Sequence, residues 1–125
     1  MSTTTQYDTI PMVPKHIKMI IDGTKTTTLR TRVFKNGFYV LRENFVDKVI
    51  VHLRPAGQIF WPLGDRMLAL RHEIAAKEGY GENLEAFENE IRAQLNVRGH
   101  TGGDDFMAGK RALYLYQIDV VEVLE

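Results

Sequence analysis

Three residues with chemically useful side chains lie close together near the start of the chain: Lys25, Thr28 and Arg30. They supply an amine, a hydroxyl and a guanidinium within six residues. A threonine hydroxyl is a poor nucleophile at neutral pH, and enzymes activate it with a neighbouring base or amine. A lysine can act as that base where burial or a nearby cation favours its neutral form. The run therefore predicts a site for nucleophilic catalysis or for binding of a carbonyl or anionic group.

The residues on either side of this run predict a helix, a tight turn and a strand. Pro14 suits the first turn of a helix that continues to Asp22, because the N–H that proline lacks would have no partner there. Gly23 is suited to the left-handed residue that ends such a helix. Residues 26–32 are mostly β-forming, so we expect the polar run to lie on a strand that follows a turn.

Backbone geometry determines which side chains of the run share a face. Alternate residues of a regular strand point to the same side, so Thr28 and Arg30 are expected to face a cleft while Leu29 faces the core. Residues three apart point to opposite faces, so Lys25 meets Thr28 only if Lys25 lies in the turn before the strand begins. The glycine at position 23 favours such a turn.

The same residues, with Gly23, resemble the Gly-x-Lys-x-x-(Glu or Thr)-x-Arg signature of ASCH domains, small β-barrels similar to the PUA domains that bind RNA. Many members carry glutamate where this chain has Thr28. Threonine there is similar to a group of bacterial amidohydrolases that remove the acetyl group from the exocyclic amine of acetylcytidine. In that group a lysine, a threonine and a later glutamate are thought to carry out the chemistry.

A second segment carries the rest of the resemblance. Residues 75–80 read Ala-Ala-Lys-Glu-Gly-Tyr and precede a segment with helical periodicity. They are similar to the part of the amidohydrolases in which the glutamate precedes a small residue and an aromatic. The resemblance therefore assigns the third catalytic role to Glu78, and it implies one ASCH domain over residues 14–125 after a flexible segment of residues 1–13.

The side-chain chemistry suggests a role for each candidate residue. We hypothesise that Thr28 is acylated, that Lys25 either activates it as the base or stabilises the oxyanion as an ammonium, and that Glu78 transfers protons. Three further residues are expected to bind the substrate: Arg30, Arg32 and Tyr80. The guanidinium at position 30 either anchors a carbonyl or phosphate or forms a structural salt bridge with Glu78 or Glu73. The tyrosine either stacks on a base or packs at the rim.

Composition limits the class of protein. The chain has 125 residues, of which 44% are hydrophobic, and this fits one domain with an ordinary core. It shows no apolar run of about 20 residues that would span a bilayer and no N-terminal signal pattern, so we expect a cytoplasmic protein without a membrane partner. The absence of cysteine excludes disulfides, thiolate zinc sites and a cysteine nucleophile.

No metal or other cofactor is expected. The histidines lack the spacing of a helical zinc motif, and they are His16, His52, His72 and His100. Residues 102–105, Gly-Gly-Asp-Asp, lack the lysine and hydroxyl of a phosphate-binding P-loop and have too few acids for a calcium loop. We interpret them as part of a mobile loop beside the site.

Charge is neutral overall but unevenly placed. The net charge of zero argues against a protein that holds long nucleic acids chiefly by neutralising phosphates. Residues 14–35 contain six basic side chains and one acidic one, whereas residues 73–90 contain six glutamates and one lysine. These stretches are either solvated faces that keep the protein in solution or, for the basic one, a rim around the site.

The remaining pattern predicts an α+β fold. Strands are expected at residues 38–41, 46–53 and 58–61, helices from 67 to about 79 and from 84 to about 99, a loop at 99–105, and a closing strand at 113–124. Strands in succession, a helical insertion and a return strand indicate a mostly antiparallel sheet with flanking helices. Closure of that sheet into a small PUA-like β-barrel is implied by the resemblance.

The functional hypothesis is a protein that binds a modified nucleoside, nucleotide or short RNA and hydrolyses the amide of an acylated cytidine. One alternative is a non-catalytic RNA-binding module in which basic side chains contact phosphates and aromatic side chains stack on bases. Another is a regulatory or interaction protein without a nucleic acid ligand. The oligomeric state does not follow from the sequence.

Overall fold

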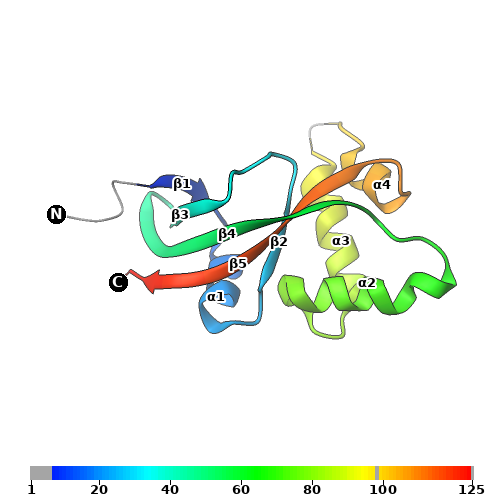
Figure 1. Cartoon of the computed structure of the whole chain (residues 1–125). Coiled ribbons are helices and arrows are strands. Elements are labelled where there is room, and N and C mark those ends of the chain that lie inside the picture. Colours follow the sequence, from blue (N-terminus) through cyan, green and yellow to red (C-terminus); the bar gives the residue numbers. More distant parts are fainter. Residues whose placement is uncertain (1–6, 98, 125) are drawn as a thin grey trace.

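The computed structural model describes residues 7–97 and 99–124, which form an α+β fold with one five-stranded sheet (Figure 1). The strands are β1 (Asp8–Pro11), β2 (Thr27–Arg30), β3 (Gly37–Glu43), β4 (Val46–Phe60) and β5 (Ala112–Val123). Their order is β1-β3-β4-β5-β2. The first pair is parallel and the others are antiparallel, so the predicted class and the mostly antiparallel sheet are confirmed.

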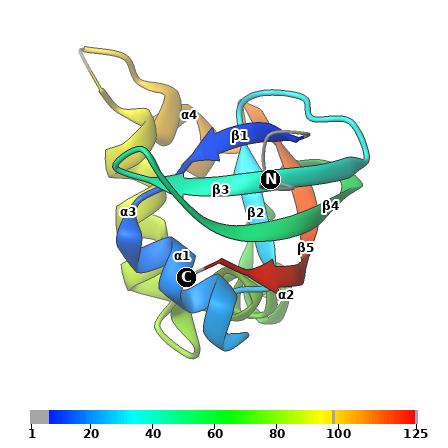
Figure 2. The same cartoon turned by 90° about the vertical axis from the view of Figure 1, so that its left-hand side faces the viewer.

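Hydrogen bonding in the described residues runs from β1 to β2 without joining these two end strands. In an end-on view the strands curve around the side of α1 (Pro14–Asp22) (Figure 2). Closure of the sheet into a barrel stays a prediction that follows from the resemblance.

Residues 8–11 differ from the expected flexible segment. They form β1, which pairs in parallel with β3, and Ile10 is buried with 3% of its surface exposed. One buried apolar residue in a four-residue strand is too short a pattern to be recognised in the sequence, so the ladder with β3 is what defines β1. Residues 1–6 lie outside the described part of the chain.

Residues 46–60 form one long strand rather than two. β4 continues through Pro55 to Gly57, where its register with β5 shifts. A bulge of this kind accommodates proline, which cannot donate to a ladder, so the proline and glycine bend the strand without ending it. β4 and β5 thereby extend from the sheet end of the molecule to its helical end (Figure 1).

The helical insertion lies between β4 and β5. It contains a 3₁₀ turn η2 (Asp65–Met67), α2 (Leu68–Ala75), a π-helical segment η3 (Ala76–Tyr80), α3 (Leu84–Leu95) and α4 (Gly102–Met107). The predicted helical period from residue 67 to about 79 is therefore divided among three segments. The helix that begins at residue 84 is confirmed, and it ends at residue 95.

Residues 102–105 begin α4, so the prediction of a mobile loop there is wrong. Asn96 Oδ1 accepts a hydrogen bond from the N–H of Gly103 at 2.8 Å. Both Gly102 and Gly103 are buried, and a Cβ at Gly103 would lie 2.3 Å from the carbonyl oxygen of Arg92. The glycines therefore allow α4 to pack tightly on α3 rather than making the segment flexible.

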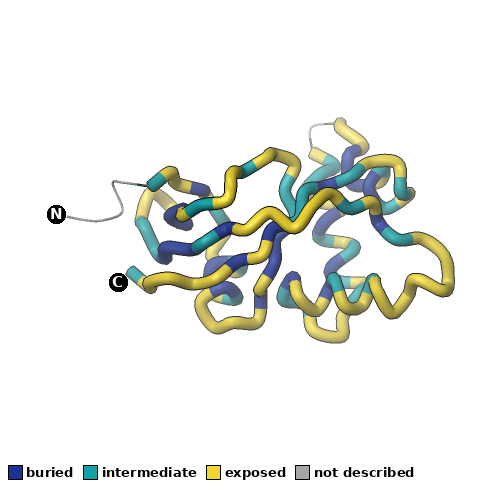
Figure 3. Tube along the Cα trace, viewed as in Figure 1, coloured by how far each residue is buried: buried dark blue, intermediate teal, exposed yellow. Residues whose placement is uncertain are grey.

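Two apolar clusters stabilise the fold, and the buried segments of Figure 3 follow them. The cluster between the sheet and α1 contains Ile10, Ile17, Ile20, Tyr39, Leu41, Val49, Val51, Leu53, Tyr116 and Ile118. The cluster at the helical end contains Trp61, Ala75, Phe87, Ile91, Phe106 and Leu113. Leu29 of β2 packs against the second cluster, so the strand that carries the polar run lies between the two ends of the molecule.

None of the helices in the described part of the chain is long and apolar enough to cross a membrane.

Candidate functional site

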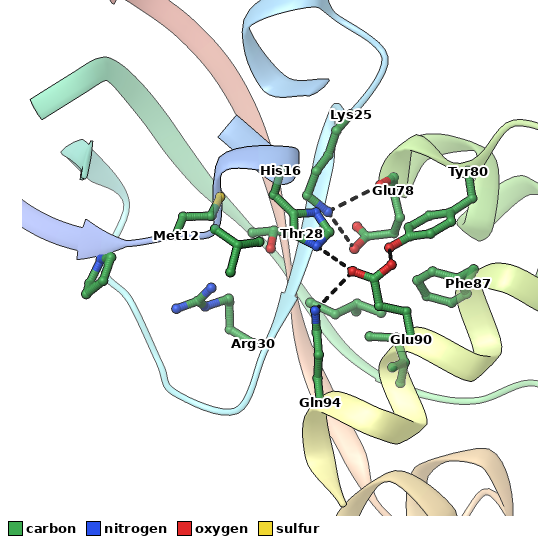
Figure 4. Close-up of a pocket in the computed structure, with 14 residues that line it drawn as sticks. Met12, His16, Lys25, Thr28, Arg30, Glu78, Tyr80, Phe87, Glu90 and Gln94 are labelled. Carbon is green, nitrogen blue, oxygen red and sulfur yellow. Dashed lines mark hydrogen bonds and ion pairs between the residues drawn. The ribbon is translucent and has the colours of Figure 1, made fainter. Parts of the chain in front are cut away.

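A cavity of about 270 Å³ opens beside β2, between α1, η3 and α3. Its lining includes five of the six residues that the sequence singles out: Lys25, Thr28, Arg30, Glu78 and Tyr80 (Figure 4). The turn before β2, β2 itself and η3 supply them. An amine, a hydroxyl and a carboxylate from two distant segments thus face one hollow, while their catalytic roles stay a prediction.

Lys25 and Glu78 form a buried ion pair on the wall of this cavity. The Nζ of Lys25 lies 3.1 Å from Oε1 of Glu78 and 3.4 Å from its backbone carbonyl oxygen. Their side chains are 4% and 3% exposed. Removing one partner of such a pair leaves an uncompensated charge in a medium of low dielectric, so each group depends on the other for its stability.

The turn after α1 directs Lys25 into the cavity. Gly23 ends the helix with a φ of 87°, and its N–H donates to the carbonyl of Ile20 at 3.2 Å, which confirms the predicted C-cap. The N–H of Lys25 then donates to the carbonyl of Met19 at 3.0 Å. Lys25 therefore precedes the first residue of β2, and this is the condition under which it shares a cavity with Thr28.

Close backbone packing brings Glu78 to β2. The N–H of Thr26 donates to the carbonyl of Lys77 at 2.8 Å. Gly79 has a φ of 100°, and a Cβ there would lie 2.8 Å from the Sδ of Met19. The left-handed backbone conformation favours glycine at this position, and the absence of a Cβ lets the Met19 side chain of α1 pack closely against it.

The two neighbouring threonines of β2 have different surroundings. Thr27 donates a short hydrogen bond from Oγ1 to Oε2 of Glu78. Thr28 lines the cavity, and in the described part of the chain its hydroxyl has no hydrogen-bond partner. The alcohol that steadies the buried carboxylate is therefore Thr27, whereas the alcohol left available to a ligand is Thr28.

Burial raises the pKa of the Glu78 carboxyl above its usual range, although the charge of Lys25 and hydrogen bonds from Thr27, Lys25 and the N–H of Leu29 oppose this effect. A carboxyl group in such surroundings retains a proton more readily than an exposed one. Glu78 is thus suited to donate a proton to a leaving group and later to accept one from water.

Glu90 of α3 faces the same cavity, but its pKa is lowered where that of Glu78 is raised. Its carboxylate receives hydrogen bonds from Lys15 at 2.8 Å, His16 at 2.8 Å, Gln94 at 3.2 Å and the phenol of Tyr80. Burial alone would raise the pKa of Glu90, but the hydrogen bonds from Lys15, Tyr80 and His16 outweigh burial and lower it to about 2. Glu90 therefore stays ionised and acts as an anchor for its neighbours.

His16 presents an unfilled acceptor near the cavity. Because Glu90 is ionised, the Nε2 of His16 carries the hydrogen of their shared bond, and in a neutral ring Nδ1 then has none. Burial and the charge of Lys25 lower the pKa of His16, against a hydrogen bond to Glu90 that raises it. Nδ1 is buried and has no partner among residues 7–97 and 99–124.

Tyr80 is held in the wall rather than free in the cavity. Its hydroxyl donates to Glu90, its ring packs edge-on against Phe87 with centroids 5.4 Å apart, and the Nζ of Lys15 lies 5.1 Å from the ring centroid. Burial and the hydrogen bond to Glu90 raise the pKa of the Tyr80 phenol, so it stays protonated. Stacking of a base on Tyr80 stays a prediction.

The two arginines occupy different places. Arg30 lines the cavity on the side away from Glu78 (Figure 4), and no ion pair of Arg30 with a carboxylate is found in the described residues, so the expected alternative of a pair with Glu78 or Glu73 is not observed. Arg32 is exposed and lines a separate hollow with Asp8 and other residues.

The basic and acidic stretches of the sequence meet at this cavity. Lys15 pairs with Glu90, and Lys25 pairs with Glu78, so each pair joins one stretch to the other. Within the part of the chain that the structure describes, no cluster of three His, Asp or Glu side chains is arranged to hold a metal ion.

Thr27, Glu90 and His16 are the contributors that sequence reasoning missed. Strand alternation directs Thr27 away from Thr28, and only tertiary packing shows that Glu78 reaches the face of Thr27. Glu90 follows buried Phe87 by three residues and precedes buried Ile91, so its position beside the apolar stripe of α3 was the available signal.

The fold is similar to that of an ASCH domain. A crystal structure of an ASCH domain from Lactobacillus crispatus JV V101 superimposes with a TM-score of 0.61 at 13% identity, covering 96% of this chain and 86% of that one. A protein from Enterococcus faecalis V583 assigned to the family DUF984 gives a TM-score of 0.53 at 12% identity, covering 87% and 68%. No protein-family model and no curated protein matches the sequence. The likeness is therefore one of fold.

Proposed function

We propose that this protein binds a modified cytidine in the cavity beside β2 and hydrolyses the amide that joins an acyl group to its exocyclic amine. The observation that carries the proposal is that Lys25, Thr28 and Glu78 line one cavity, although Lys25 and Glu78 are 53 residues apart in the chain. The likeness to an ASCH domain supports a PUA-like role in binding RNA or nucleotides, at the level of the fold.

The first step prepares the base. A proton moves from the Nζ of Lys25 to Oε1 of Glu78 across their 3.1 Å contact, so one N–H bond breaks and one O–H bond forms. The ion pair is the resting state, and burial makes this transfer easier, because it raises the pKa of Glu78 and disfavours two charges over two neutral groups. Lys25 then carries a free amine in the cavity that Thr28 also lines.

Acyl transfer to the protein follows. The Oγ1 of Thr28 bonds to the acyl carbon while its proton passes to the amine of Lys25. Lys25 becomes an ammonium at the moment at which the oxyanion forms, so its roles as base and as oxyanion donor are successive. The carbon–nitrogen bond then breaks, the amine of the cytidine takes the proton of Glu78, and Thr28 is left as an ester.

Water completes the cycle. The Glu78 carboxylate takes a proton from water as the hydroxide adds to the ester carbon. When the new intermediate collapses, the oxygen of Thr28 leaves and takes its proton from the ammonium of Lys25. A carboxylic acid is released, and the amine, the hydroxyl and the protonated carboxyl are restored.

Release of cytidine from acetylcytidine tests the proposal. We expect turnover by the wild-type protein, none by Thr28→Ala, and undiminished turnover by Thr31→Ala, which removes an exposed hydroxyl three residues away. Turnover retained by Thr28→Ala would reject the covalent mechanism. Failure of the wild type on a panel of acylated nucleosides and their 5′-monophosphates would reject the hydrolase.

One observation favours a second candidate, a binding module without catalysis. In the described residues neither Arg30 nor Arg32 has a carboxylate partner, so both guanidinium groups are available to phosphates. Such a module would bind short RNA with an affinity that falls as salt rises, and it would release no amine from any acylated nucleoside.

A further inference from the structure

Two guanidinium groups share one aromatic ring at the outer side of the cavity. The Cζ of Arg30 lies 5.7 Å from the ring centroid of Phe34, and the Cζ of Arg32 lies 5.3 Å from the same centroid. Arg30 lines the cavity beside β2, whereas Arg32 lines the neighbouring hollow of about 460 Å³. Phe34 lines that hollow too, so the two arginines lie where the cavity and the hollow adjoin. We refer to Arg30 and Arg32 as the arginine pair.

Contacts with Tyr116 and Tyr39 hold the ring of Phe34 in place beneath the arginine pair. The hydroxyl of buried Tyr116 accepts a hydrogen bond from the N–H of Phe34 at 2.7 Å and donates one to the carbonyl of Arg32 at 3.1 Å. The Phe34 ring packs edge-on against Tyr39 and Tyr116, with centroids 5.6 and 5.8 Å away. The two cations are therefore held over a rigid support before any ligand arrives.

The arginine pair lacks a counter-charge of its own. Asp8 lines the hollow beside Arg32, yet no ion pair of either arginine is found among residues 7–97 and 99–124. Arg30 is partly buried, and burial together with the charge of Arg32 lowers its pKa. Two like charges near each other, one of them partly desolvated, are unfavourable until an anion lies between or beside them.

Guanidinium groups bind phosphate through paired N–H donors, and two of them suit its several oxygens better than the single charge of a carboxylate. Glu78 lies at one side of the cavity and Arg30 at the other, with Thr28 between them (Figure 4), so a base between Thr28 and Glu78 places the rest of a nucleotide toward the arginines. This direction matches a ligand with a base at one end and a phosphate at the other.

We propose that the arginine pair is a phosphate site, and that the ligand of this protein is a phosphorylated nucleoside rather than a free one. This inference rests on the proposed function for the placement of the base, whereas the phosphate site itself rests on the arginines and their support. The phosphate belongs either to a mononucleotide or to the backbone of RNA, and these share the same recognition.

The test is calorimetric binding of cytidine, cytidine 5′-monophosphate and a cytidine dinucleotide. We expect the monophosphate to bind wild type about tenfold or more tightly than cytidine at low salt, because charge-assisted hydrogen bonds are stronger than neutral ones. Arg30→Gln and Arg32→Gln should each remove most of this preference. Arg54→Gln removes an equal charge from an exposed pair with Asp119 and should keep it.

Tyr116→Phe separates positioning from charge. It keeps the ring and both arginines but removes the hydroxyl that joins Arg32 to Phe34, so the preference for the monophosphate over cytidine should fall several-fold. Because this readout is a ratio of two affinities of the same variant, a general loss of stability does not change it.

The outcomes separate the two proposals. Equal affinity for cytidine and its monophosphate, or a preference that survives both arginine substitutions, would overturn the phosphate site while leaving hydrolysis of nucleosides intact. If no nucleoside binds but inorganic phosphate raises the thermal midpoint of wild type and not of Arg30→Gln, the phosphate site holds and the proposed function fails. A dinucleotide that binds as well as the monophosphate would assign the phosphate to an RNA backbone.

Discussion

Two carboxylates face the cavity from adjacent elements, and their surroundings move their pKa values apart. Glu78 lies on η3 with one lysine, one threonine and a backbone N–H around it, and burial raises its pKa. Glu90 lies on α3 with 23% of its side chain exposed, and hydrogen bonds lower its pKa to about 2 despite the opposing effect of burial. When surroundings separate the pKa values of two carboxyl groups in this way, one is suited to acid–base catalysis and the other to a permanent charge. The difference supports the proposed proton transfer by Glu78 and leaves Glu90 to hold Lys15, His16 and Tyr80 in position.

The largest loss of stability is expected from Lys25→Met. It leaves Glu78 buried without its cation, and breaking such a pair costs about 3–5 kcal/mol. Urea unfolding should show that loss, and it should show a smaller loss for Lys25→Met combined with Glu78→Gln, because the double variant buries no charge. A Lys25→Met protein within about 1 kcal/mol of wild type would mean that the pair is not buried as described.

Valine substitutions of the two threonines are expected to give the next largest change in stability. Thr27→Val removes a hydrogen bond to a buried carboxylate and should cost about 1–3 kcal/mol, whereas Thr28→Val should cost less than about 1 kcal/mol. Activity should respond in the opposite order, because only Thr28 is the proposed nucleophile. Chemical denaturation and turnover are measured on both variants. A Thr28→Val protein that stays active would assign the nucleophile elsewhere.

These threonines also show how much of the site the sequence contained. The helix over Pro14–Asp22 and its C-cap at Gly23 follow from local rules, so both were predictable. The presence of Lys25, Thr28 and Glu78 in one site came from the resemblance, because no spacing rule joins residues 53 apart. The contact of Thr27 with Glu78 depends on the approach of η3, which no local pattern encodes.

Tertiary packing also explains the other differences. Gly102 and Gly103 indicate a loop by composition, yet they allow α4 to contact Arg92 of α3. His16 and Glu90 belong to different helices, and their hydrogen bond exists only once both helices pack beside β2. Local propensity cannot report a contact of this kind, since nothing in either helix alone requires it.

Glu90→Gln should have a moderate and pH-dependent effect. The folded pKa of about 2 lies below the ordinary value of 4.5, so the unfolded state binds more protons between these values and the stability from Glu90 grows as pH rises through them. Relative to wild type, the variant should lose about 1 kcal/mol at neutral pH, because water screens part of the interaction. That difference should shrink as pH falls from about 4.5 to 2 in thermal unfolding. A difference independent of pH would contradict the opposite environments of the two carboxylates.

Lys15→Met should have the smallest effect. The side chain is 59% exposed and its pair with Glu90 is largely solvated, so the loss should stay below about 1 kcal/mol and should decrease with added salt. Urea unfolding at two ionic strengths measures it. A loss as large as that of Lys25→Met would remove the contrast between the buried pair and the exposed one.

Intact-protein mass spectrometry of the wild type, quenched with acid during the first turnovers on acetylcytidine, tests the covalent mechanism most directly. We predict a mass increase of one acetyl group, located on Thr28 by peptide mapping and absent from Thr28→Ala. An acetyl group on another residue, or released cytidine with no acylated protein under any condition, would contradict it.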